Sequence, residues 1–204
     1  MFREKSPEEK AWDVVSGQSH DKIAEIQKTI KGYSYKRKDI SLATDENICR
    51  HFVDSLSQSK KLLFSISDTC FSLHVGNNIL PLTDIMRDEV DILSDEIKVR
   101  HCEWQDIPPD FLNKVISHDL KMLTGLQKIN KNLDIVFVAI IEQAKKNKGD
   151  SKFWKKVRIG LLKIRGQVRE LVILFKERET LCNINPITLE RTFQSIRREI
   201  RGKV

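Results

Sequence analysis

Glycine and proline are scarce in this chain, with only eight and five of them among 204 residues. A fold built from many short strands needs such residues at its turns, so this scarcity argues against an all-β protein. No apolar run approaches the roughly 20 residues that a membrane-spanning helix needs. The opening sequence, MFREKSPEEKAW, lacks the apolar segment of a secretory signal. We therefore expect a cytoplasmic protein.

Signatures of catalysis and of metal binding are also missing. The chain contains no GxxxxGK[ST], GxGxxG or GxSxG motif, and its five histidines have neither zinc-finger nor HExxH spacing. We accordingly predict no catalytic residue, no cofactor and no metal, and we expect that the protein is not an enzyme. The four cysteines form no CxxC pair, and we expect reduced thiols in a core. They are Cys49, Cys70, Cys102 and Cys182.

Short helices are predicted at the N-terminus. Ser6 and Pro7 are typical of a helix start, as an N-cap followed by a first-turn proline. A second short helix carries Ile23, Ile26 and Ile30 on one face and stops at Gly32. The segment 33–43 has no clean period and is predicted as a connector. We divide the chain into residues 1–40, with short helices and a connector, and residues 41–204, a domain of long helices.

Apolar residues in the rest of the chain recur at steps of three and four, which predicts long amphipathic helices. The expected stretches run from a Thr44 cap to Gly76-Asn77-Asn78, from Pro81 to Trp104, from Asp110 to Ala144, from a cap at Asp150 or Ser151 to Phe175, and from Pro186 through Leu189, Phe193, Ile196 and Ile200. Long stripes joined by short turns must bury one another. The prediction is an all-α, elongated antiparallel bundle of about four to six helices.

The stretch 145–169 holds ten Lys or Arg residues and one acid. Its apolar residues form a seam at bundle spacing from Trp154 to Phe175, which favours a core helix with a basic outer face. A membrane-surface helix and a calmodulin-type target are the other interpretations. Burial of the seam would exclude both.

The helix predicted after Pro81 is acidic instead. Four aspartates recur at steps of four, three and four, and two glutamates follow at heptad spacing. These residues are Asp84, Asp88, Asp91 and Asp95, with Glu89 and Glu96. Such a stripe can hold a divalent cation, remain solvated, or pair with basic residues across the bundle. The candidate basic partners are Lys155, Arg158, Arg165 and Arg169.

The segment MRDEVDILSDEI (86–97) resembles a helix of the PhoU-like proteins, helical bundles linked to phosphate uptake and its regulation. The resemblance implies a regulatory bundle and marks acidic positions that hold metal in that family. Arg87, Arg165 and Arg169 stand at such positions here. Arginine has no oxygen ligand to offer, so a PhoU-like protein without the usual metal centre is implied. We hypothesise that an arginine–carboxylate contact replaces metal bridging.

These patterns favour a regulatory or scaffolding protein that acts by binding. A basic face would contact an acidic protein partner or an anionic membrane surface, and a homo-oligomer is expected. Its residues are Lys155, Lys156, Arg158, Lys163, Arg165 and Arg169. The alternative is a basic helical protein that binds nucleic acid, because these cations also suit phosphates.

Overall fold

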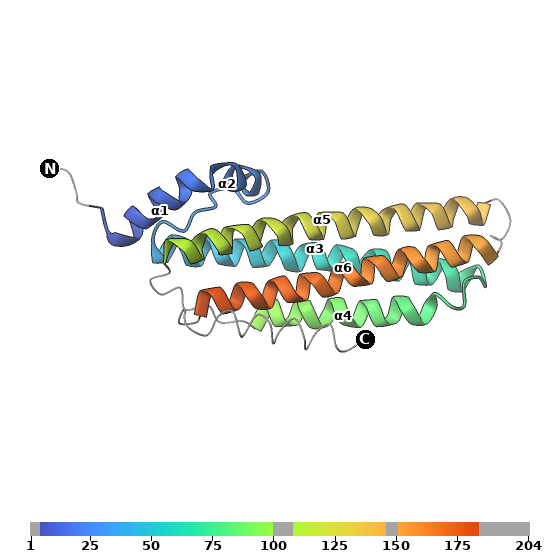
Figure 1. Ribbon diagram of the computed structural model, residues 1–204. Helices are drawn as coiled ribbons and strands as arrows, with labels where there is room; N and C mark the ends of the chain where they lie inside the picture. The colour runs from blue at the N-terminus through green and yellow to red at the C-terminus, as the bar shows by residue number, and fades with distance from the viewer. Residues whose placement is uncertain (1–4, 100–107, 146–150, 184–204) are drawn as a thin grey trace. The chain divides into compact units, whose positions relative to one another are not determined.

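The computed structural model describes residues 5–99, 108–145 and 151–183. Those residues form six α-helices and no strand, which confirms the all-α bundle (Figure 1). The helices are α1 (Pro7–Gln18), α2 (His20–Gln27), α3 (Lys38–Ser72), α4 (Leu80–Val99), α5 (Pro109–Lys145) and α6 (Ser151–Asn183). In this part of the chain, no helix combines the length and the apolar character that crossing a membrane requires.

The chain divides into two compact units, and α3, α5 and α6 contribute to both. The first comprises residues 1–51, 100–124 and 173–204, and the second comprises residues 52–99 and 125–172. Each unit thus combines separate stretches of chain. The division after residue 40 remains a prediction.

Helix α1 of the first unit begins as the sequence predicts, whereas α2 ends at Gln27 and so does not reach Ile30 or the predicted stop at Gly32. Ser6 is the N-cap of α1, and its side chain accepts a hydrogen bond from the Glu9 amide while Glu9 accepts one from the Ser6 amide. This reciprocal capping box satisfies two amides that the first helical turn leaves unpaired. Asn113 on α5 bonds the side chains of Ser19 and Gln18, so the junction of α1 and α2 is attached to α5.

The second unit packs the long helices through the predicted apolar stripes. Lys60 pairs with Asp91, and Arg87 lies over the ring of Phe64. The later residue of α3 contacts the earlier residue of α4, since Phe64 meets Arg87 and Lys60 meets Asp91. These two helices are therefore antiparallel. Side chains from all four long helices are buried here, including Leu63, Val90, Leu133 and Leu161.

Helix ends are where the predictions fail. Helix α3 begins at Lys38, so Thr44 lies inside it and does not cap it. The Thr44 hydroxyl instead donates to the Ser34 carbonyl, which holds the connector against the helix. At the other end, His74 adopts a positive φ of 52°, and the Val75 amide bonds the Cys70 carbonyl. This six-to-one bond is the Schellman closure, so His74, two residues before Gly76, takes the left-handed position.

Several predicted features lie outside the described residues. They are Cys102, Trp104, Asp150 and the helix expected after Pro186. The other cysteines, Cys49, Cys70 and Cys182, are buried and reduced. Burial raises the pKa of the Cys70 thiol to about 11. A thiol in such surroundings is a packing group and not a nucleophile.

Candidate functional site

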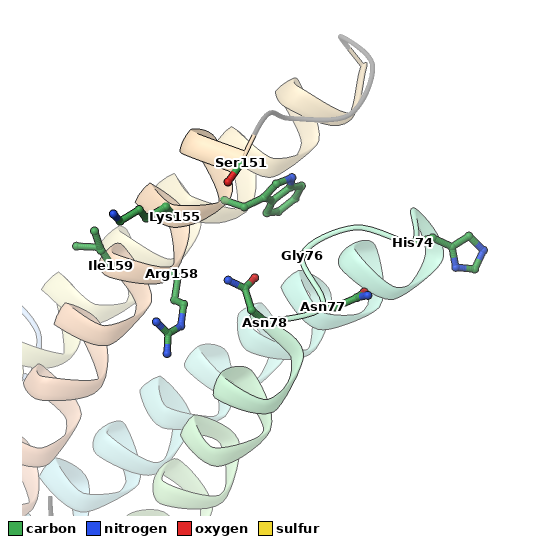
Figure 2. Close-up of a pocket in the computed structure, with 9 residues that line it drawn as sticks. His74, Gly76, Asn77, Asn78, Ser151, Lys155, Arg158 and Ile159 are labelled. Carbon is green, nitrogen blue, oxygen red and sulfur yellow. The ribbon is translucent and has the colours of Figure 1, made fainter.

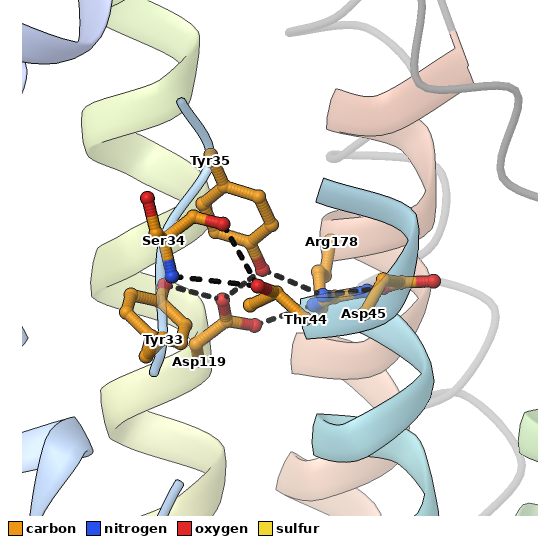
Figure 3. Close-up of polar contacts among 7 residues, drawn as sticks. All are labelled: Tyr33, Ser34, Tyr35, Thr44, Asp45, Asp119 and Arg178. Atoms are coloured by element: carbon orange, nitrogen blue, oxygen red, sulfur yellow. Dashed lines mark hydrogen bonds and ion pairs between the residues drawn. The ribbon is translucent and has the colours of Figure 1, made fainter. Parts of the chain in front are cut away.

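A fully buried polar cluster forms in the first unit around Arg178 of α6 (Figure 3). Its Nε atom donates to Oδ1 of Asp119 on α5, and its Nη2 atom lies 2.7 Å from Oδ1 of Asp45 on α3. Two hydroxyls from the connector complete the cluster. Tyr33 and Tyr35 each donate to Oδ2 of Asp119 at 2.7 Å. One guanidinium therefore ties three long helices and the connector together.

Burial decides how this cluster titrates. It raises the pKa of Tyr33 and Tyr35 well above the usual range, and the nearby Asp119 carboxylate raises both further. Burial alone would lower the pKa of Arg178, but Asp119 and Asp45 raise it well above its ordinary value. The tyrosines thus stay neutral donors and the arginine stays charged. With no solvent exposure at Arg178 or Asp119, this cluster is an anchor and not a reactive site.

A second buried pair lies beside the anchor. The imidazole of His118 places Nδ1 2.8 Å from the Lys114 carbonyl and Nε2 3.0 Å from Oε2 of Glu177. A carbonyl can only accept a hydrogen bond. Both contacts with an ionised Glu177 therefore form only when the imidazole carries two protons. The pair joins α5 to α6 within the first unit.

In the second unit, two arginines of α6 hold Glu89 of α4. Arg165 donates from Nε to both carboxylate oxygens at 3.0 Å and from Nη2 to Oε1 at 2.7 Å. Arg169 adds bonds of 3.3 and 3.2 Å to Oε1. The arginine–carboxylate contact hypothesised from the sequence is therefore present. Glu89 forms it, and the aspartates of the stripe do not.

The aspartates of the acidic stripe have separate local partners. Asp84 pairs with Arg87, Asp91 with Lys60 and Asp95 with Lys98. Asp88 is exposed and forms no ion pair with a described residue. Among the described residues, no three His, Cys, Asp or Glu side chains are grouped as metal ligands would be. Asp84, Asp88 and Asp95 lie exposed, whereas Asp91 pairs across the bundle with Lys60. The alternative pairing of the stripe with Lys155 or Arg158 is not found among the described residues.

Beyond Lys152 in its first turn, four cations of α6 remain exposed, with no ion pair to any described residue. We call them the exposed basic face: Lys155, Lys156, Arg158 and Lys163. The apolar seam of the same helix is buried at Val157, Leu161 and Ile164. A membrane-surface helix or a calmodulin target would have to release that seam. The structure therefore excludes both interpretations of the seam. The outward side chains of α6, cations and exposed apolar residues alike, remain available for binding.

A cleft of about 660 Å³ opens beside the start of α6. The turn after α3 supplies His74, Gly76, Asn77 and Asn78, and α6 supplies Ser151, Trp154, Lys155, Arg158 and Ile159. In Figure 2 the side chains of Asn78 and Arg158 point into the space between the turn and the helix, whereas His74 points away. The cleft is open, and two cations of the exposed basic face line it, Lys155 and Arg158. It suits contact with an anionic group.

Sequence reasoning missed the buried cluster completely. Arg178 lies in a charged run, KERE, that gives no sign of burial. The two tyrosines were the available signal, because a buried hydroxyl needs a partner. Comparisons with family models, with curated proteins and with solved structures found no match for this chain.

Proposed function

We propose that this chain is a non-catalytic regulatory or scaffolding protein that binds an acidic protein surface through the exposed basic face of α6. One observation carries the proposal: Lys155, Lys156, Arg158 and Lys163 are exposed without internal partners, whereas the neighbouring arginines are engaged by Glu89. Charges that stabilise no contact of their own fold remain available to a partner.

Two features favour protein over nucleic acid as the partner. Trp154 and Phe153 contact each other edge to face, with their centroids 5.0 Å apart, and both are only partly exposed. Bases would need free aromatic faces to stack on. The exposed side chains among the cations are apolar, Ile159 and Leu162. An interface between proteins combines such apolar residues with a charged rim.

The resemblance to PhoU-like proteins supports a regulatory role linked to phosphate transport. The clamp of Arg165 and Arg169 on Glu89 would then do the work of cross-linking helices that metal does in that family. The proposed activity is binding alone, since the anchor around Arg178 is closed to solvent.

Binding of a labelled polyglutamate peptide tests the proposal. We expect wild-type protein to bind the peptide. The variant Lys155→Glu, Lys156→Glu, Arg158→Glu should bind it at least roughly tenfold more weakly. The matched control is Lys121→Glu, Lys128→Glu, Lys131→Glu, which makes the same change in net charge on exposed positions of α5.

Parallel titrations with duplex DNA and with phosphatidylserine vesicles identify a different partner. Tight binding to DNA with a steep salt dependence, and none to polyglutamate, would replace this proposal with the nucleic-acid alternative. An equal loss of polyglutamate binding in the α5 control would show that only net charge matters, and would refute the exposed basic face.

A further inference from the structure

Exposed apolar side chains lie along the α4–α6 face of the second unit. On α4, Ile85 is 43% exposed and Ile92 is 61% exposed; on α6, Ile159 is 45% exposed and Leu162 is 41% exposed. A single exposed isoleucine needs no explanation, but large residues that recur along two adjacent helices mark an interaction surface.

The clamp on Glu89 shows that these residues share one face. Ile85 lies four residues before Glu89 and Ile92 lies three after it, so both are on the side of α4 that meets α6. Leu162 lies three residues before Arg165, which holds Glu89 from α6. Ile159 is one turn earlier. The exposed isoleucines and leucine therefore border the same seam between the two helices.

Opposite charges flank this face on its two sides. Asp84 and Asp88 stand beside Ile85 on α4 and are exposed, whereas Lys155 and Lys163 stand beside Ile159 on α6 and are exposed. A surface that is apolar in the centre, acidic on one helix and basic on the other is complementary to itself. The surface of α6 is also open at Gly166, where an added Cβ would have no atom within 4 Å.

We propose that the acidic partner of the exposed basic face is a second copy of this chain, bound through the α4–α6 face as a two-fold dimer. This inference rests on the proposed function and names its partner. In such a dimer each copy contributes the same patch. Ile85 of one copy packs on Ile159 and Leu162 of the other, and Asp84 and Asp88 face Lys163.

The charge distribution also determines which direction of the two-fold axis is favourable. An axis across the helices would set α4 on α4 and bring like charges together, which costs free energy. An axis along the helices sets α4 of each copy on α6 of the other and pairs opposite charges twice. The second arrangement is the one we propose.

Charge reversal with internal rescue tests the dimer. Sedimentation velocity of the full chain at micromolar concentration should show a dimer that weakens as salt rises. The variant Lys155→Glu, Lys163→Glu and the variant Asp84→Lys, Asp88→Lys should each dissociate at least tenfold more readily. A chain that carries all four substitutions has the wild-type net charge and should dimerise again. The control Lys128→Glu, Lys131→Glu on α5 should leave the dimer intact.

Each outcome decides the matter. A monomeric wild type overturns the dimer. So does a variant with all four substitutions that stays monomeric while circular dichroism shows that it is folded. A monomeric wild type that still binds polyglutamate overturns the dimer alone and leaves the proposed function standing. A wild type that neither dimerises nor binds polyglutamate overturns both. A dimer that polyglutamate dissociates supports both, because peptide and partner then compete for the same cations.

Discussion

Arg178 donates a hydrogen bond from Nε to Oδ1 of Asp119, and both side chains are completely buried. Two carboxylates, those of Asp119 and Asp45, meet this one guanidinium. Taking such groups out of water is costly unless each is paired. One guanidinium cannot neutralise two carboxylates, and the hydroxyls of Tyr33 and Tyr35 stabilise the remaining charge by donating hydrogen bonds to Oδ2 of Asp119. Every charge in the cluster therefore has partners although it is buried.

Removal of the guanidinium should be the most damaging single change in the first unit. Arg178→Met leaves two carboxylates buried without their cation, and we expect the free energy of unfolding to fall by about 3–5 kcal/mol. Urea denaturation followed by circular dichroism measures the loss. Removing a cation from an exposed position of α5, as in Lys128→Met, should change stability by less than about 0.5 kcal/mol. A similar small loss for Arg178→Met would mean that the anchor contributes little.

Alkaline pH should test the same cluster through its tyrosines. Both tyrosines of the chain are in it, so tyrosinate absorbance reports on nothing else. Their pKa values are raised well above the usual value near 10 in the folded state. Stability is therefore unaffected by the tyrosines below pH 10 and falls as the pH rises above it, because only the unfolded chain ionises easily.

We expect tyrosinate absorbance to appear together with the loss of helical circular dichroism, and not before it. Tyr33→Phe should weaken the alkaline dependence of the free energy of unfolding. Tyrosinate that forms near pH 10 while the helices remain intact would show that the hydroxyls reach solvent in the folded protein.

Periodicity was enough to predict the helices but not their partners. The three-and-four spacing of residues such as Val157, Leu161 and Ile164 requires a buried stripe, and all three are buried. Spacing within one helix says nothing about the helix opposite. The acidic stripe therefore suggested several partners for Arg165 and Arg169, and only the structure identifies Glu89 as the one that they hold.

Local signals also competed at helix ends. Thr44 has the chemistry of an N-cap, yet its hydroxyl bonds the Ser34 carbonyl from within α3. Gly76 has the chemistry of a helix stop, yet His74 takes the left-handed position first. In both places a contact that the local sequence does not reveal determined where the helix begins or ends. The burial of Arg178 had no local signal at all.

The clamp on Glu89 should contribute modestly to stability. Glu89, Arg165 and Arg169 are each about a quarter exposed, so water screens much of the attraction. We expect Glu89→Gln to lower the free energy of unfolding by about 0.5–1.5 kcal/mol, with a smaller effect in high salt. Asp95→Asn, which breaks a more exposed pair with Lys98, should cost less than about 0.5 kcal/mol. Equal effects would mean that the clamp is no stronger than a surface pair.

Purified protein should retain no stoichiometric metal. Asp84, Asp91 and Asp95 of the stripe are paired with Arg87, Lys60 and Lys98, and no three His, Cys, Asp or Glu side chains of the described residues are grouped as metal ligands would be. Elemental analysis of wild type beside the variant Asp88→Asn, Asp91→Asn measures this directly. Iron, zinc or magnesium at one equivalent in the wild type, lost in the variant, would make the acidic stripe a metal site.

The turn after α3 should be sensitive to a single methyl group at Gly76. Its φ of +65° is one that residues with a side chain rarely adopt, and a Cβ there would lie 3.1 Å from Cε3 of Trp154. Gly76→Ala therefore strains the backbone and pushes against the indole ring, and we expect it to lower the free energy of unfolding by about 1–2 kcal/mol. Gly17→Ala is the matched control, because Gly17 lies in α1, has no positive φ and has nothing within 4 Å of its added methyl. There alanine should stabilise the protein by about 0.4–1 kcal/mol. Denaturant unfolding of both variants decides the matter, and a neutral Gly76→Ala would show that the turn relaxes without Trp154 as its support.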